Sequence, residues 1–307
     1  MADMLDIAVK DQSDEVRVRV SEVELVDLVQ DMGAWDGAFL VLQRVPDLPD
    51  VYVQTCPVGG EWTVEHRAGS PTRHYETRVA DLERVADLLI RWSRQEADWD
   101  AGVEWQRMDF GPAPEPAPLE LSEEDEKSLV EAVRGLLHRG YATRKQAAEL
   151  AADHLRRDGA DPVTAAQAEQ LADRLWLERV AEQRTWTGRT DPERLAGAFT
   201  ALEARGITAR ENFTCCHSCG QAEIGAEAEP DSRGFVYFHS QSTDHAVAGH
   251  GLSLYYGGFD GSEDTTAAIG REVVAALEES GLTVRWNGSP AQAIEVTGLD
   301  WRRRLIG

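Results

Sequence analysis

The residues of this 307-residue chain that can do chemistry are concentrated in one short run, Phe213-Thr-Cys-Cys-His-Ser-Cys-Gly220. Three of its four cysteines, Cys215, Cys216 and Cys219, lie within five residues of one another. Thiolate sulfur binds Zn²⁺ and other thiophilic ions, and a free thiolate is also a nucleophile and a redox group. The run is therefore the candidate for a metal or thiol site.

Two of these cysteines have the spacing of a zinc ligand pair. Cys216 and Cys219 are separated by two residues, so both thiolates can face one tetrahedral ion. Gly220 favours a turn, because glycine tolerates positive φ and leaves room for backbone N–H groups to donate to sulfur. The chain has no second CxxC, so further ligands must come from Cys215, His217, His239, His245 or His250. We predict a zinc site formed by Cys216, Cys219, Cys215 and His239.

The backbone conformation of residues 213–216 decides which sulfurs can meet, and a strand is expected there. In an extended strand adjacent side chains point to opposite faces, so at most one of Cys215 and Cys216 should join Cys219. Three interpretations stay open: a structural zinc site, reduced cysteines that only pack, and a thiol redox or nucleophilic site. The nearby acids Glu211 and Glu223 oppose a low thiol pKa, so the redox interpretation ranks third.

Helices followed by a small sheet are predicted to position the cysteines. Apolar residues recur at helical spacing in segments that begin near residues 122, 143, 161 and 191. Strand signals return at residues 213–216, 234–239, 252–256, 282–286 and 293–296, with helices at about 243–248 and 265–280. The C-terminal half is therefore predicted to be a helical bundle leading into a small mixed α/β sheet.

The N-terminal part has the period of an antiparallel sheet. Alternating apolar residues predict strands at 4–9, 15–20, 38–44, 51–55, 62–66 and 103–108. Helices at 21–33 and 80–95 are expected to cover this sheet. Four prolines in residues 111–118 predict a semi-rigid linker. We predict an α+β protein of two domains: residues 1–110, a linker of 111–119, and residues 120–307, with helices in 120–206 and a cysteine-containing α+β segment in 207–307.

Composition limits the partners and the compartment. The 55 acids and 31 bases give a formal charge of −24, which repels nucleic acid and anionic membranes and favours a basic protein partner. No segment has the roughly 20 apolar residues of a membrane span, and the first residues lack a signal sequence. We expect a cytoplasmic protein, in which the cysteines stay reduced or bind metal.

Several motifs after residue 120 carry a resemblance. They are Arg194-Leu-Ala-Gly-Ala-Phe199, Phe213-Thr-Cys-Cys-x-Ser-Cys-Gly220, Gly234-Phe-Val-Tyr-Phe-His239, Trp286-Asn-Gly-Ser and Trp301-Arg-Arg-Arg304. Residues 120–307 resemble a bacterial family of domains of unknown function that carries the FTCCxSCG signature. Its members tend to show Gln-Asp-Thr where this chain has Gln241-Ser-Thr243, and the lost acid argues against catalysis there. Residues 1–110, with Asp50-Val-Tyr-Val-Gln-Thr55, are similar to small immunity proteins of toxin systems.

Two classes of function follow from these observations. The first is a non-catalytic protein-binding module, immunity-like or regulatory, with a structural zinc site. The alternative is a metal- or thiol-dependent enzyme, or a redox sensor, centred on the cluster from Cys215 to Cys219. A closed set of four protein ligands would indicate a structural ion, whereas an open position beside a general base would indicate catalysis.

Overall fold

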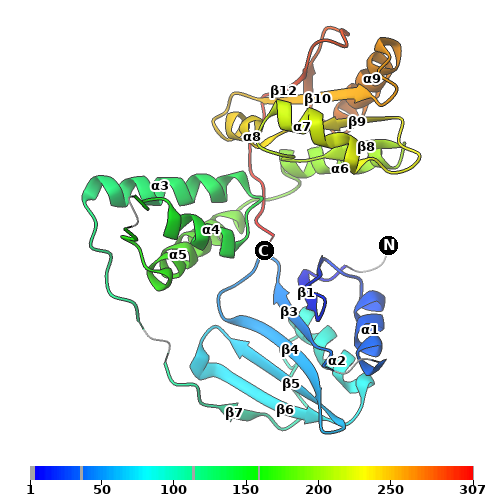
Figure 1. Ribbon diagram of the computed structural model, residues 1–307. Coiled ribbons are helices and arrows are strands. Elements are labelled where there is room, and N and C mark those ends of the chain that lie inside the picture. Colours follow the sequence, from blue (N-terminus) through cyan, green and yellow to red (C-terminus); the bar gives the residue numbers. More distant parts are fainter. Residues whose placement is uncertain (1–3, 35–36, 113–114, 158–159, 307) are drawn as a thin grey trace. The chain divides into compact units, whose positions relative to one another are not determined.

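Alternating apolar residues in the first part of the chain form a seven-stranded antiparallel sheet, as predicted (Figure 1). In sheet order the strands are β2 (Val16–Val18), β1 (Ile7–Asp11), β3 (Leu40–Arg44), β4 (Val51–Val58), β5 (Glu61–Ala68), β6 (His74–Val79) and β7 (Gln106–Met108). Within this sheet, β6 is the strand that the sequence pattern did not predict. Its register sets Tyr75 opposite His66 on β5.

Two helices, α1 (Glu22–Asp31) and α2 (Leu82–Ser93), supply the apolar layer against this sheet. Ser21 begins α1 with the predicted capping box, in which its hydroxyl accepts from the Glu24 N–H and the Glu24 carboxylate accepts from the Ser21 N–H. The apolar stripe of α2 buries Leu88 and Leu89 completely. The N-terminal part is therefore a sheet with covering helices.

The middle of the chain is helical, and a five-stranded mixed sheet follows it. The helices are α3 (Glu123–Arg139), α4 (Arg144–Asp153), α5 (Ala165–Gln183) and α6 (Asp191–Glu203). The second sheet has the order β11 (Thr283–Arg285), β12 (Ile294–Thr297), β10 (Leu252–Gly258), β9 (Gly234–Tyr237) and β8 (Ile207–Arg210). Only β8 and β9 pair in parallel, so the sheet is mixed, as predicted.

The second sheet is covered on both faces. Val236 and Phe238 point into the main core with α6 and α9 (Glu263–Glu279). The alternate residues Phe235 and Tyr237 join a smaller aromatic cluster with Phe213 and Tyr255. Helix α7 (His217–Glu223), which the sequence pattern did not predict, packs against this smaller cluster through His217 and Gly220. Strand β9 continues into α8 (Ser240–Val247), which begins three residues before the predicted helix.

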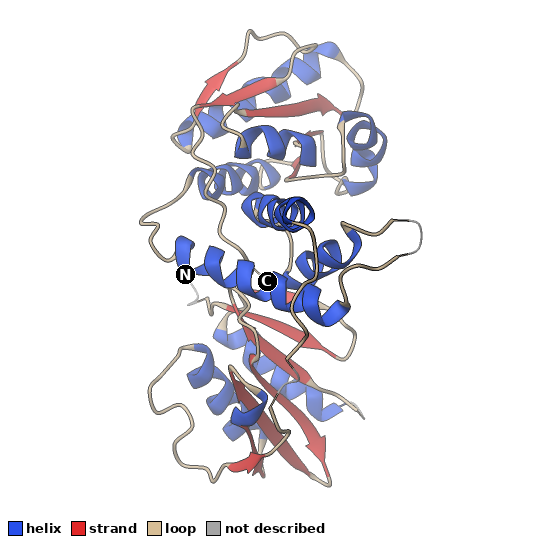
Figure 2. Cartoon of the chain, turned by 90° about the vertical axis from the view of Figure 1, so that its left-hand side faces the viewer, coloured by secondary structure: helices blue, strands red, loops and turns tan. Residues whose placement is uncertain are grey.

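The structure describes residues 4–34, 37–112, 115–157 and 160–306. The chain forms two compact units: residues 1–134, 142–180 and 305–307 make the first, and residues 135–141 and 181–304 make the second. Each unit contains one of the two sheets, with strands red and helices blue in Figure 2. The predicted linker, 111–119, includes residues 113–114, which lie outside the described residues, and the predicted domain bounds stay a prediction. Within the described ranges, no helix has the length and apolar character needed to span a bilayer.

Asp47, which follows strand β3, accepts hydrogen bonds from two of the helices of the first unit. Its backbone carbonyl accepts a 2.7 Å hydrogen bond from the indole Nε1 of Trp176, which is fully buried on α5. Its carboxylate accepts a 2.8 Å bond from Arg144 Nε, and Arg144 also donates to Asp173 at 2.7 Å. One guanidinium thus pairs with two carboxylates, and its hydrogen bond and charge lower the cost of burying Asp47.

His66 on β5 lies in a cluster of aromatic rings. Its imidazole stacks on Tyr75 with ring centroids 4.9 Å apart, and Trp99 and Trp105 present their edges to it at 4.9 and 4.7 Å. The pKa of His66 is lowered from 6.5 to about 4, chiefly by burial among these rings; Asp100 opposes the shift, and His74 and Arg73 add to it. The ring is therefore neutral at physiological pH.

Acidification is expected to destabilise the first unit through His66. Because the pKa is lower in the folded chain, the unfolded chain takes up the proton first as the pH falls below about 6.5. This contribution to stability is complete above about pH 6.5 and is lost as the pH falls toward 4. The whole shift corresponds to about 3 kcal/mol, and screening by water at the partly open ring reduces the expected loss to about 2 kcal/mol.

Urea unfolding at about pH 7 and about pH 4.5 measures this effect when wild type is compared with His66→Phe. The variant keeps an aromatic ring and cannot take up the proton, so wild type should lose about 2 kcal/mol more than the variant. Equal losses in the two proteins would show that carboxylates alone set the acid sensitivity.

Candidate metal centre

The loop that carries the cysteines is a turn and not the predicted strand. Asn212 and Thr214 both have positive φ, +48° and +58°, which folds the chain back on itself. The Phe213 N–H donates to the carbonyl of Phe238 at 2.7 Å. The Ser240 hydroxyl donates to the Cys215 carbonyl at 3.2 Å, so the loop is fixed to the end of β9 and the start of α8.

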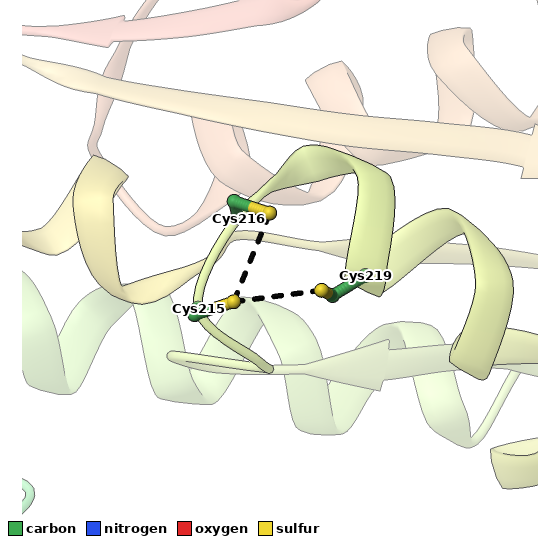
Figure 3. A group of neighbouring side chains, drawn as sticks. All are labelled: Cys215, Cys216 and Cys219. Atoms are coloured by element: carbon green, nitrogen blue, oxygen red, sulfur yellow. Dashed lines mark hydrogen bonds between the residues drawn. The ribbon is translucent and has the colours of Figure 1, made fainter.

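This turn brings the three thiols together. Cys215 Sγ lies 3.5 Å from Cys219 Sγ and 3.7 Å from Cys216 Sγ, and all three sulfurs lie within 4.8 Å of one another (Figure 3). The expectation that only one of the adjacent pair could join Cys219 is wrong, because it assumed an extended chain. In the observed conformation Cys216 is the N-cap of α7 and Cys219 lies in its first turn.

The separations of the sulfurs fit a single ion. Zn–S bonds of about 2.3 Å at tetrahedral angles place neighbouring sulfurs about 3.8 Å apart. Cys215 Sγ lies 3.5 and 3.7 Å from the other two sulfurs, distances that are close to that value and well beyond the roughly 2.05 Å of a disulfide bond. All four cysteines of the chain are free thiols. The cluster is therefore a group of three thiols that could hold a metal ion.

Two thiols of the cluster, Cys216 and Cys219, differ in how readily they ionise. The pKa of the Cys216 thiol is lowered, first because the Cys219 backbone N–H is directed toward its sulfur and next because the Cys215 thiol donates to it. The pKa of Cys219 is raised to about 12, because its thiol hydrogen-bonds to Cys215 and Cys216 and its ionisation would add a charge beside theirs. A divalent cation removes this repulsion, since it stabilises all three thiolates at once.

Cys215 is exposed, whereas Cys216 and Cys219 are half-buried. An ion at the centre of the three sulfurs would therefore have protein on one side and solvent on the other. Three thiolates would supply three of the four ligands of a tetrahedral ion, and the fourth would come from another group.

His239, the predicted fourth ligand, is not part of the group of close ligand atoms found among the described residues, which contains only the three cysteines. It is the N-cap of α8: its Nδ1 accepts the Ser242 N–H at 3.1 Å, and its ring stacks on Tyr255 with centroids 5.2 Å apart. The structure thus unites the three predicted cysteines, and ligation by His239 stays a prediction.

The role of Gly220 differs from the predicted one. The residue lies inside α7 with ordinary helical φ. Because it has no side chain, the helix can pack closely against the ring of Tyr237. A Cβ atom built on Gly220 would lie 2.4 Å from Tyr237 Cε2 and 2.7 Å from Cζ. The Tyr237 hydroxyl donates to the carbonyl of His217 at 3.2 Å, which fixes the first turn of the helix over the ring. Close contact between α7 and Tyr237 therefore positions Cys216 and Cys219.

Comparison with curated proteins and with solved structures finds no match to this chain. A family model described as a domain of unknown function, DUF6891, matches residues 122–305, which include all three clustered cysteines and His239. This match spans more than half of the chain and agrees with the resemblance seen in the motifs after residue 120. The chain therefore belongs to the DUF6891 family of domains of unknown function.

Proposed function

We propose that this protein is a non-catalytic metal-binding module whose Cys215, Cys216 and Cys219 hold one thiophilic ion, with Zn²⁺ as the best match. The observation that carries the proposal is the separation of the sulfurs, which already approaches that of a tetrahedral thiolate site. Three soft sulfur ligands favour Zn²⁺ or Cu⁺ over Mg²⁺ or Ca²⁺, which prefer oxygen.

A binding role fits the surroundings of the cluster better than a hydrolytic one. Among the described residues the metal-ligating group contains only cysteines, and a hydrolytic zinc centre also needs a general base beside the bound water. We propose that the exposed side of the site meets a protein partner. The charge of −24 favours a basic surface on that partner and disfavours nucleic acid. Reduced thiols this close together further suit the reducing cytoplasm.

The same distances support a second candidate, a thiol redox switch. Cys215 and Cys219 need to approach by only about 1.5 Å to form a disulfide of normal length. In that reaction an external disulfide would be reduced to two thiols while the two cysteines are oxidised and lose two protons and two electrons. The product would carry one disulfide and would no longer hold an ion through three thiolates.

Native mass spectrometry of protein purified under reducing conditions without chelator distinguishes these functions. We expect one zinc ion per chain, and at least about 100-fold weaker zinc binding for Cys216→Ser and Cys219→Ser. Cys56→Ser is the matched control, because Cys56 lies on β4, outside the cluster, and should leave zinc binding unchanged.

Zinc-free wild type that also fails to take up added Zn²⁺ would refute the metal site. If that zinc-free protein instead loses two hydrogen atoms reversibly on mild oxidation, and Cys219→Ser does not, the redox switch is the correct function. Binding of zinc by both Cys216→Ser and Cys219→Ser with wild-type affinity would place the ion elsewhere.

A further inference from the structure

A pocket of about 480 Å³ opens in the first unit, between the inner face of the N-terminal sheet and the loop that follows α2. Its lining includes His66 and Tyr75 from neighbouring strands, Trp92 from α2, and Trp99 and Trp105 from the loop. The volume is in the range of small-molecule sites, which are typically concave and largely aromatic or apolar. The cysteines of the second unit have no part in it.

Aromatic rings form the walls of this pocket. Trp99 and Trp105 meet at 5.5 Å and both abut the imidazole of His66, which in turn stacks on Tyr75. Burial keeps that imidazole neutral at physiological pH, so it acts as one more flat ring. Such walls bind planar groups, because ring contacts add favourable energy to the burial of apolar surface.

Arg44 supplies a positive charge in this aromatic setting. Its guanidinium lies 3.5 Å above the ring of Trp92 and donates through Nη1 to the carbonyls of Trp92 and Ser93, at 2.7 and 3.2 Å. No carboxylate of the described residues forms an ion pair with it. Burial alone lowers the pKa of Arg44 to about 10, with no acid to compensate. In a chain of charge −24 a partly buried cation without a counter-ion is unusual, and an anion would relieve its desolvation.

The rim of the pocket carries a further positive charge. Arg73 is exposed there and has no carboxylate partner among the described residues, and Asp100 is the acidic residue of the lining. Arg67 also borders the pocket, although its guanidinium donates to Asp50 at 2.9 Å and is thereby neutralised. The unpaired charges that face the space are therefore mostly positive.

We propose that this pocket binds a small planar organic anion, an aromatic carboxylate, whose ring lies against Trp99 and Trp105 and whose carboxylate pairs with Arg44. This function is separate from the metal site, and either can fail without the other. The fork of the guanidinium suits a carboxylate because it offers parallel N–H donors in one plane.

The test uses 2-naphthoate and its neutral isostere 2-naphthamide as probes, with binding followed by isothermal titration calorimetry and tryptophan quenching. Naphthoate should bind at least about tenfold more tightly than the amide, as a charge-assisted hydrogen bond to a partly buried partner requires. Arg44→Gln should remove this preference, and Trp99→Leu should weaken both probes about tenfold.

Arg78→Gln is the matched control, because Arg78 is exposed on β6 and points away from the face that carries Tyr75. It should leave both affinities unchanged. If Arg44→Gln does not fold, Arg73→Gln gives the same test at the rim, where it should reduce the preference for naphthoate. Equal affinity for the two probes, no saturable binding up to about 1 mM, or naphthoate binding that survives both Arg44→Gln and Trp99→Leu would overturn the proposal.

Discussion

Replacing Trp176 by alanine is expected to lower the free energy of unfolding of the first unit by about 4 kcal/mol. The indole is fully buried on α5, so its removal leaves a large cavity, and the neighbouring side chains lose their van der Waals contacts with it. The change also removes the 2.7 Å hydrogen bond to the Asp47 carbonyl and leaves that acceptor without its indole donor.

Hydrogen exchange of the amides in β3 and β4 measures this loss in the unit concerned, where about 4 kcal/mol corresponds to roughly 1000-fold faster exchange. Leu177→Ala is the control, because the neighbouring side chain on the same helix is 44% exposed and should change exchange little. If the two variants behave alike, α5 does not support the N-terminal sheet in solution.

Replacing Gly220 by alanine is expected to destabilise the second unit by about 2 kcal/mol and to weaken zinc binding at least about tenfold. The new methyl group would lie 2.4 Å from the ring of Tyr237, which is completely buried and cannot move aside. Overpacking of this kind costs about 3 kcal/mol, and the better helix propensity of alanine offsets about 1 kcal/mol of it. Displacement of α7 then moves Cys216 and Cys219 relative to Cys215.

Gly225→Ala is a matched control in the same segment, because nothing lies within 4 Å of a Cβ at that position. Exchange of the β9 amides and zinc competition should both be unchanged in this variant. A double-mutant cycle with Tyr237→Leu adds a second check, since the smaller side chain makes room for the methyl group. The two changes should therefore cost less together than the sum of the single changes, and strict additivity would contradict the proposed clash.

Local patterns predicted most of the fold. The alternation in β1 to β5, the stripe of α2 and the capping box at Ser21 each depend on residues close in sequence, so they could be identified directly. Strand β6 was missed because only three of its six residues are buried, so its sequence shows no regular alternation of apolar and polar residues. It also begins with a polar residue, His74, directly after a short 3-10 turn. Which neighbour covers each helical stripe is a tertiary property, so the contact of Trp176 with Asp47 was not predictable.

The candidate site was predicted in its residue types but not in its geometry. Asn212 and Thr214 both have positive φ, which a β-branched residue such as Thr214 rarely adopts. This backbone conformation places the thiols of Cys215 and Cys216 close together. Tertiary packing against Tyr237 likewise explains a glycine that the sequence suggested was a turn residue. The pocket under the N-terminal sheet left no motif, because its rings come from β5, β6, α2 and a loop.

The path of the chain limits how this protein can be divided. The backbone passes from one compact unit to the other after residues 134, 141, 180 and 304, so no single cut separates them. The segment shared with the DUF6891 family, residues 122–305, includes Trp176 and lacks Asp47. A gene fragment that encodes the family segment alone would therefore produce a chain in which the Trp176 indole lacks its hydrogen-bond acceptor at Asp47.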